Sequence, residues 1–276
     1  MILELSDEFD LEKNAESGQC FRWERTGPAR YRILSGAESL NIAALGDGRF
    51  ALDCGEPEFA AYWRDYFDLG ENYAAIRGRI DPAADPFLAA AAAQEKGIRI
   101  LRQDPWETLV SFIISQNKNI PAIRRCIESL AERCGEARRD AAGRPYFAFP
   151  TPAAVAALSE QALCACALGY RWRYVRAAAC AVLDGTLELE PLRALDAPAA
   201  IEALTGLYGV GVKVASCVAL FGLHCLDAFP RDVWVKRILE REYPNGYPME
   251  AYAPYNGVYQ QYMFAYYRHL AARREG

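Results

Sequence analysis

A short glycine-rich turn between two apolar segments is the feature that most restricts how this chain can fold. Gly209-Val-Gly211 separates the two segments. Glycine adopts backbone angles that other residues avoid, so the pair allows a very tight reversal. Asp196 and Pro198 are typical of a helix start. We therefore predict a helix, a turn and a second helix over about residues 198–222, with the second helix beginning near Val212.

The same turn carries a possible chemical function. The first N–H groups of a helix have no partner inside it, and the helix dipole makes that end attractive to anions. The backbone of Gly209, Gly211 and Val212 is therefore a candidate phosphate site, although an ordinary turn between helices would look similar. Lys213 follows directly. The dipole and partial burial would lower its pKa, and a neutral amine is a nucleophile; a plain surface lysine is the alternative.

Asp232 is the second candidate chemical group. It follows Pro230, which interrupts the chain, and precedes a helical segment for which aspartate is a good N-cap. A carboxylate fixed there could stabilise positive charge that develops on a sugar ring, or assist a nearby amine. The role of a simple helix cap is the alternative.

Composition excludes several classes of protein. The chain has 276 residues, of which 52% are hydrophobic. No apolar run reaches the roughly 18 residues that a membrane span needs. The N-terminus lacks an export signal, so we expect a cytoplasmic protein whose nine cysteines are reduced. The cysteine spacing and the presence of only two histidines argue against a metal site, and we expect no metal and no cofactor.

Arginine and aromatic side chains alternate in the segment Tyr170-Arg-Trp-Arg-Tyr-Val-Arg176. Aromatic rings can stack on nucleic-acid bases or wedge into a duplex. The net charge of −5 argues against a general nucleic-acid coat but allows a local basic face. Solvated helix surfaces account for most of the other basic residues.

The order of the predicted elements indicates an α+β fold. Residues 19–54 have the pattern of short strands joined by hairpin turns. Residues 57–80, and nearly all residues after 86, have the pattern of helices. We predict an N-terminal antiparallel β-sheet domain over residues 1–98 and a mainly helical domain over residues 99–276.

Six sequence segments form a series along nearly the whole chain. They are Ser17–Trp23, Arg102–Pro105, Ser111–Ile120, Leu168–Val175, Gly209–Cys217 and Pro230–Val233. Together they resemble the 8-oxoguanine DNA glycosylase/lyase family of the helix-hairpin-helix DNA glycosylases, in family order. The glycine turn, lysine and aspartate occur in several related glycosylases. The Gly-Gln-x-Phe-Arg-Trp and Asn-x-Asn-Ile patterns are more diagnostic of the oxoguanine branch.

The resemblance implies a reaction as well as a fold. The family acts on double-stranded DNA that contains 8-oxoguanine and flips the damaged nucleotide out of the duplex into a pocket. By resemblance, Lys213 attacks C1′ of that sugar and expels the base. The resulting Schiff base undergoes β-elimination, which nicks the strand 3′ to the lesion. Asp232 would be the electrostatic and proton-handling partner, and such an enzyme needs only a monomer.

The resemblance also assigns a base pocket. Gly18 looks like the glycine whose carbonyl accepts a hydrogen bond from N7–H of oxoguanine, a donor that guanine lacks. Gln260 resembles the residue that bonds the Watson–Crick edge, while Phe264 and Cys217 resemble the residues that stack on the two faces of the base. Singly, each suits a plainer role in a turn, a surface or a core. Their joint occurrence in order favours a pocket.

Asn117, Tyr170 and Arg171 resemble the family groups that fill the gap in the stack and contact the orphaned cytosine. One partner in this set differs. Ala122 stands where the family has a second cytosine-reading arginine. The loss of its donors should weaken discrimination among the bases opposite the lesion.

Two other positions differ from the family pattern, and two alternatives stay open. Trp234 stands where the vertebrate branch has a phosphate-contacting histidine, and Tyr208 replaces a proline before the glycine turn. The first alternative is an alkylated-base glycosylase of the same superfamily, against which Lys213 argues. The second is a non-catalytic helix-hairpin-helix DNA-binding module. Such a module would not need Lys213, Asp232 and a base pocket together.

Overall fold

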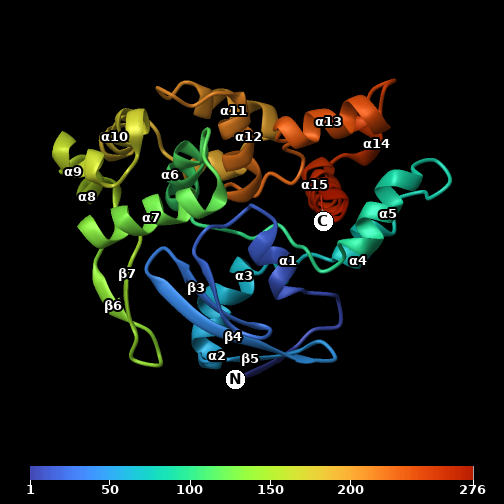
Figure 1. Ribbon diagram of the computed structural model, residues 1–276, viewed down its shortest axis with the longest axis horizontal. Helices are drawn as coiled ribbons and strands as arrows, with labels where there is room; N and C mark the ends of the chain where they lie inside the picture. The colour runs from blue at the N-terminus through green and yellow to red at the C-terminus, as the bar shows by residue number, and fades with distance from the viewer. Residues whose placement is uncertain (276) are drawn as a thin grey trace.

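The structure is a computed structural model that describes the backbone of residues 1–275 and the side chains of residues 1–270. A β-sheet lobe lies at one end, and layers of helices lie at the other (Figure 1). The lobe contains a five-stranded antiparallel sheet in the order β1-β5-β4-β3-β2. Its strands are β1 (Ile2–Glu4), β2 (Trp23–Gly27), β3 (Arg30–Ser35), β4 (Glu38–Gly46) and β5 (Arg49–Leu52).

Alternating burial explains why this segment forms a sheet. Ile33 in β3 pairs with Leu40 in β4, and both side chains are fully buried, while their neighbours along each strand are more exposed. The buried face packs against α1 (Leu11–Glu16) and a helical run made of α2 (Glu56–Glu58), a π-helical turn (Phe59–Trp63) and α3 (Arg64–Tyr66). Strands β2–β5 lie in the predicted range, whereas the short edge strand β1 was not predicted.

Helices make up most of the rest of the chain, which confirms the predicted α+β class. Within the described residues, none has the length and apolar composition needed to cross a bilayer. They are α4 (Tyr73–Arg77), α5 (Pro86–Gln94), α6 (Pro105–Ser115), α7 (Ile120–Cys134), α8 (Pro152–Ala156), α9 (Glu160–Ala165), α10 (Trp172–Leu183), α11 (Ala197–Thr205), α12 (Val212–Phe221), α13 (Val233–Glu242), α14 (Met249–Tyr252) and α15 (Asn256–Glu275).

Local capping explains where the central helices begin. The Asp104 carboxylate accepts a hydrogen bond from the Glu107 N–H at 2.7 Å, and α6 then runs through the core with nearly every side chain buried. Asp196 accepts from the Ala199 N–H at 2.9 Å and starts α11. The turn that follows leads into α12 at Val212, so the predicted helix, turn and helix are all present.

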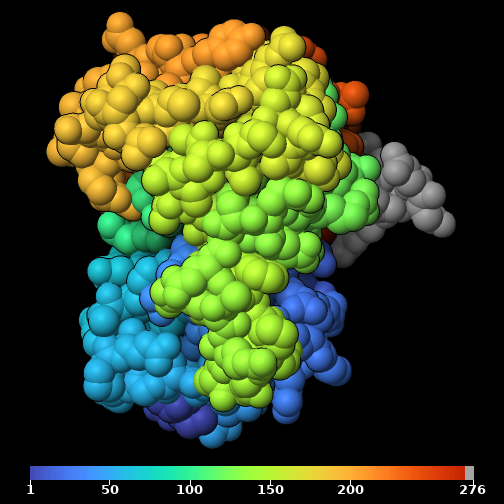
Figure 2. Space-filling model, turned by 90° about the vertical axis from the view of Figure 1, so that its left-hand side faces the viewer, coloured from blue at the N-terminus to red at the C-terminus, as the bar shows by residue number. Residues whose placement is uncertain are grey.

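A second, small hairpin interrupts the helical part and corrects the prediction of an almost wholly helical segment. Strands β6 (Ala137–Arg139) and β7 (Pro145–Phe147) are only three residues long, too short to show a strand periodicity. The hairpin extends from the helical part onto the sheet lobe (Figure 2). Arg32 and Asp140 form an ion pair there at 3.0 Å, and the Tyr146 hydroxyl donates to the Ala37 carbonyl at 2.7 Å.

The packing of α4 and α5 bears on where the two parts of the chain meet. Buried side chains such as Tyr73, Ile76 and Leu88 belong to the core of the helical part, not to that of the sheet lobe. They precede the predicted boundary between residues 98 and 99. That boundary remains a prediction. Ile98 and Ile100 belong to the core of the helical part and Leu101 to that of the sheet lobe, so the two cores meet at this stretch.

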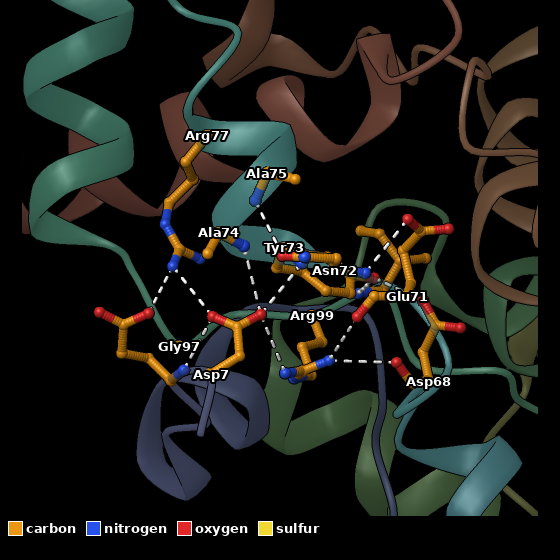
Figure 3. A network of polar contacts seen from close by, with 12 residues as sticks. Asp7, Asp68, Glu71, Asn72, Tyr73, Ala74, Ala75, Arg77, Gly97 and Arg99 are labelled. Atoms are coloured by element: carbon orange, nitrogen blue, oxygen red, sulfur yellow. Dashed lines mark hydrogen bonds and ion pairs between the residues drawn. The ribbon is translucent and has the colours of Figure 1, made fainter. Parts of the chain in front are cut away.

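A network of polar contacts ties the sheet lobe to α4 (Figure 3). The Asp7 carboxylate accepts hydrogen bonds from the Tyr73 N–H at 3.0 Å, from Arg77 at 3.1 Å and from Arg99 at 3.2 Å. Burial alone would raise the pKa of Asp7, but its contacts with Arg77 and Glu8 and the charge of Arg99 outweigh it and hold the pKa below its ordinary value. The carboxylate therefore joins three segments in its ionised form.

A second carboxyl group joins helix α6 to the turn between β3 and β4, and its pKa is shifted in the opposite direction to that of Asp7. Glu107 accepts a hydrogen bond from the Gly36 N–H at 2.6 Å. Burial raises the pKa of Glu107 to about 7, although the charge of Arg22 and the bond from Gly36 act to lower it. A carboxyl group with a raised pKa binds its proton more tightly in the folded protein than in the unfolded chain.

Glu107 should therefore make stability fall as pH rises from its unfolded pKa near 4.5 toward 7, because the folded state holds the proton that the unfolded chain releases. Glu107→Gln keeps an oxygen acceptor for Gly36 and removes the proton. We expect the variant to be more stable than the wild type at pH 8 by roughly 2–3 kcal/mol, and nearly equal at pH 4. Urea unfolding at both pH values measures the difference, and parallel pH profiles would contradict the assignment.

Candidate active site

The six residues predicted to act on a base and its sugar converge on one small pocket. Helix α12 contributes Lys213 and Cys217, α15 contributes Gln260 and Phe264, and two loops contribute Gly18 and Asp232. The pocket encloses about 50 Å³. The remaining lining residues are Ser17, Phe112, Phe221, Pro230 and Gln261.

Lys213 lies in the first turn of α12, over an aromatic ring. Its Nζ is 5.5 Å from the centre of the Phe112 ring, which stacks on Phe221 at 5.6 Å with an interplanar angle of 18°. This cation–π contact gives the amine a defined position. Lys213 is exposed, so the partial burial expected from the sequence is wrong. In the described part of the chain, it forms no ion pair with a carboxylate.

Asp232 is the N-cap of α13, as predicted. Its carboxylate accepts a hydrogen bond from the Val235 N–H at 2.8 Å, which fixes the side chain at the pocket. Burial raises the pKa of the Cys217 thiol to about 11, with the charge of Lys213 opposing the shift and that of Asp232 adding to it. Both charges thus act on the same buried thiol. The thiol of Cys217 is therefore neutral and presents a polarisable sulfur atom to the pocket.

Gly18 and Gln260 present polar groups to the pocket. Gly18 has a φ of +79°, a left-handed conformation that favours glycine, and its carbonyl belongs to a loop held by Gln261, whose side chain donates to the Ser17 carbonyl at 2.6 Å. Gln260 is 4% exposed, and its Oε1 has no hydrogen-bond partner among the described residues. A buried acceptor without a partner is costly, so this amide suits a ligand.

The two glycines of the turn have different structural roles. Gly209 has a φ of +83°, and a Cβ there would lie 2.1 Å from the ring of Tyr174, so only glycine fits. Gly211 has an ordinary φ of −91° and no neighbour within 4 Å of a built Cβ. It is the N-cap of α12 without a side-chain cap, and the adjacent Val212 is 67% exposed. The first N–H groups of α12 therefore face open space, which suits an anion.

Asn117, Tyr170 and Arg171 also lie together, but not all are exposed. Asn117 has a φ of +51°, and its side chain donates to the Tyr170 hydroxyl at 3.2 Å. Both side chains are exposed. The Arg171 side chain is instead 6% exposed and donates to the Gln116 carbonyl at 2.7 Å and the Leu168 carbonyl at 3.3 Å. Arg171 holds the turn that presents Asn117.

Sequence reasoning missed three residues that support the site. The Phe112 ring contacts the Lys213 amine, and Gln261 holds the Gly18 loop. The Gln116 side chain donates a hydrogen bond to the Gly209 carbonyl at 3.1 Å. Phe112 gave no signal, because α6 is apolar on almost every side. Gln261 did give one, since a second buried amide beside Gln260 in a largely apolar stretch needs a partner.

Comparison with known proteins explains the arrangement. Residues 110–247 match the HhH-GPD superfamily of base excision DNA repair proteins, and residues 1–109 match the N-terminal domain of 8-oxoguanine DNA glycosylase. The fold and the pocket thus define a member of the HhH-GPD superfamily. Within it, the chain belongs to the 8-oxoguanine DNA glycosylase family, which confirms the resemblance seen in the sequence.

Solved structures and a curated relative agree with this assignment. The chain is similar to MBOgg1 in complex with a low-affinity DNA ligand, with a TM-score of 0.91 and 35% identity over 98% of this chain and 96% of that one. For 8-oxoguanine glycosylase/lyase of Clostridium acetobutylicum in complex with double-stranded DNA, the values are 0.88 and 32%, over 98% of each chain. An N-glycosylase/DNA lyase of Saccharomyces cerevisiae is 34% identical over 75% of this chain. The matches span 56% to 65% of the length of the curated relatives.

The two glycines should respond differently to the same substitution. Gly209→Ala places a methyl group into Tyr174 at a left-handed backbone position, and we expect it to destabilise the fold by at least about 2 kcal/mol. Gly211→Ala meets no atom and keeps its φ, so its cost should stay within about 1 kcal/mol. Urea unfolding of the pair measures the contrast. Equal losses would show that Tyr174 does not restrict this turn.

Proposed function

We propose that this chain is a base-excision repair enzyme that removes 8-oxoguanine from double-stranded DNA and then cuts the strand as an AP lyase. The observation that carries the proposal is the convergence of the Lys213 amine, the Asp232 carboxylate and the unpaired Gln260 amide on one pocket. The pocket lies beside a helix N-terminus suited to a phosphate. The similar proteins from Clostridium acetobutylicum and Saccharomyces cerevisiae carry the names 8-oxoguanine glycosylase/lyase and N-glycosylase/DNA lyase.

In the proposed reaction, Lys213 supplies the nucleophile. Its amine in the neutral form bonds to C1′ of the flipped nucleotide, the C1′–N9 bond breaks, and the purine leaves with a proton. The C1′–O4′ bond then breaks as a proton passes from Nζ to O4′, and C1′ becomes doubly bonded to Nζ as a Schiff base. Loss of a proton from C2′ then expels the 3′ phosphate and nicks the strand. Asp232 stabilises the positive charge that develops on the sugar while the base departs.

The pocket would distinguish the lesion by hydrogen bonding and stacking. The carbonyl of Gly18 accepts from N7–H, which 8-oxoguanine has and guanine lacks, and Gln260 bonds the Watson–Crick edge. The ring of Phe264 and the neutral thiol of Cys217 face the base from its two sides. The N–H groups of Gly211 and Val212 hold a backbone phosphate, and this grip places C1′ near Lys213.

Asn117 and Tyr170 would fill the gap that the flipped nucleotide leaves. Both are exposed and are joined by a hydrogen bond, so they can enter the duplex as one unit. Arg171 is buried and holds this turn through the Gln116 and Leu168 carbonyls. To supply the remaining contact to the opposite base, it would exchange one of these bonds. Ala122 has no donor to offer there. The opposite strand is therefore contacted by fewer groups than the family pattern provides.

Borohydride trapping on a duplex with one 8-oxoguanine tests the lyase mechanism. We expect the wild type to form a covalent adduct on this duplex and none on undamaged DNA, because reduction captures the Schiff base at Lys213. Lys213→Gln should give no adduct and no base excision. If the wild type forms no covalent adduct, the assignment of lyase activity is wrong.

Two variants control this experiment. Lys236→Gln removes an exposed lysine on α13 and should trap like the wild type. Asp232→Asn keeps the helix cap, since asparagine caps as well as aspartate, but removes the charge. We expect it to melt like the wild type and to lose excision. If Asp232→Asn folds and excises the base as fast as the wild type does, Asp232 acts only as a helix cap.

The rate of excision opposite different bases tests whether Ala122 weakens recognition of the opposite cytosine. We expect comparable single-turnover excision of 8-oxoguanine opposite cytosine and opposite adenine. Ala122→Arg restores a potential cytosine-reading donor and should raise the preference for cytosine by about tenfold. Ala122→Met, of similar length without charge, is the control and should not. A strict cytosine preference in the wild type would contradict this role of Ala122.

A further inference from the structure

Arg268 contacts the pocket from outside and has no role in the function proposed above. It lies one helical turn after Phe264 on α15, and its guanidinium carbon is 5.4 Å from the centre of the Phe264 ring. Its Nη1 donates to the Glu16 carbonyl, the last of α1, at 3.1 Å. The carbonyls at the C-terminal end of a helix carry partial negative charge, so they attract cations. No carboxylate pairs with Arg268 in the described part of the chain, so its contacts are the ring and the backbone oxygen.

Arg268 completes a regular pattern between α15 and the loop that carries Gly18. Three successive residues, the last of α1 and the first two of the loop, each contact a residue of α15. The Glu16 carbonyl accepts from Arg268, the Ser17 carbonyl accepts from Gln261, and Gly18 packs on Phe264, whose ring would lie 3.6 Å from a Cβ built there. These three contacts join the Gly18 loop to α15 beside the pocket.

The size of the pocket gives these contacts a consequence. Its volume of about 50 Å³ is small for a ligand site, since pockets for small molecules usually measure about 300–1,000 Å³. We therefore expect lining side chains to shift when a base is inserted. Among the three side chains proposed to contact the base, Cys217 and Gln260 are fully buried and Phe264 is half-buried, so Phe264 has the most room to move. Arg268 does not line the pocket, and its guanidinium lies over the Phe264 ring.

We infer that Arg268 is a positioning residue for base excision, which presses Phe264 against the inserted base and anchors α15 to the Gly18 loop. The inference rests on the proposed function. A guanidinium over a ring favours one ring position without blocking small shifts, because the attraction is broad and electrostatic. The hydrogen bond to Glu16 keeps the guanidinium there. Arg268 acts through Phe264 and need not touch the base or the sugar.

Two substrates separate this role from general effects on stability or DNA affinity. Excision of 8-oxoguanine needs the base pocket, whereas nicking of a duplex with a preformed abasic site needs Lys213 but no base. With enzyme in saturating excess, Arg268→Met should slow single-turnover excision by about three- to tenfold. Nicking of the abasic duplex should stay within about twofold of the wild type. Arg268→Lys keeps a cation over the ring and should recover most of the excision rate.

A double-mutant cycle with Phe264 identifies the route of the effect. In a Phe264→Leu background, Arg268→Met should cause no further loss of excision, because the ring on which Arg268 acts is absent. Arg241→Met, which removes an exposed arginine at the far end of α13, is the matched control and should behave like the wild type. Melting temperatures of all variants show whether each is folded.

The outcomes distinguish this inference from the proposed function. If the wild type excises 8-oxoguanine and Arg268→Met excises at the same rate or faster, the positioning role is wrong. Equal losses on both substrates, or full additivity with Phe264→Leu, also overturn it, because they indicate a DNA contact. If the wild type acts on neither substrate, the proposed function itself fails.

Discussion

The pocket depends on one buried amide that joins the two parts of the chain. Gln19 is fully buried, and its Nε2 donates to the Arg99 carbonyl at 2.8 Å and the Ser17 hydroxyl at 2.9 Å, while its Oε1 accepts from the Leu101 N–H at 2.9 Å. Since Gly18 is the preceding residue, these bonds place its carbonyl. Loss of any of them would leave a buried polar group unpaired, so the loop has one favoured position.

The proposed phosphate site and the turn proposed to fill the gap form a second connected unit. Gln116 lies between them, because its side chain donates to the Gly209 carbonyl and its own carbonyl accepts from Arg171. Tyr174 packs beneath Gly209 and makes an edge contact with Tyr170 at 5.6 Å. A displacement of the glycine turn would therefore be transmitted to Tyr170 and Asn117. If the proposed roles hold, phosphate binding and gap filling are coupled through these contacts.

Sequence predicted the parts of this structure that depend on neighbouring residues. Asp104, Asp196 and Asp232 each cap a helix as expected, because a cap is a local interaction. The pocket residues came from resemblance to a family, and no periodicity in the chain would have brought Gly18 to Phe264. The contacts of Phe112 with Lys213 and of Arg268 with Glu16 join segments far apart in sequence, so they could be found only in the folded chain. The short β6–β7 hairpin was missed because strands of three residues show no periodicity.

The hairpin formed by β6 and β7 contributes contacts between the two lobes, and both lobes supply residues to the pocket. Lys213 and Asp232 belong to the helical part, whereas Gly18, the proposed reader of N7, belongs to the sheet lobe. The ion pair of Arg32 with Asp140 is one of the contacts that join the two lobes, and it lies outside the pocket. The Gly18 loop is also held to α15 by the hydrogen bond from Gln261 to the Ser17 carbonyl. The pocket is therefore complete only when both lobes are docked, because the helical part alone lacks the wall that Gly18 forms.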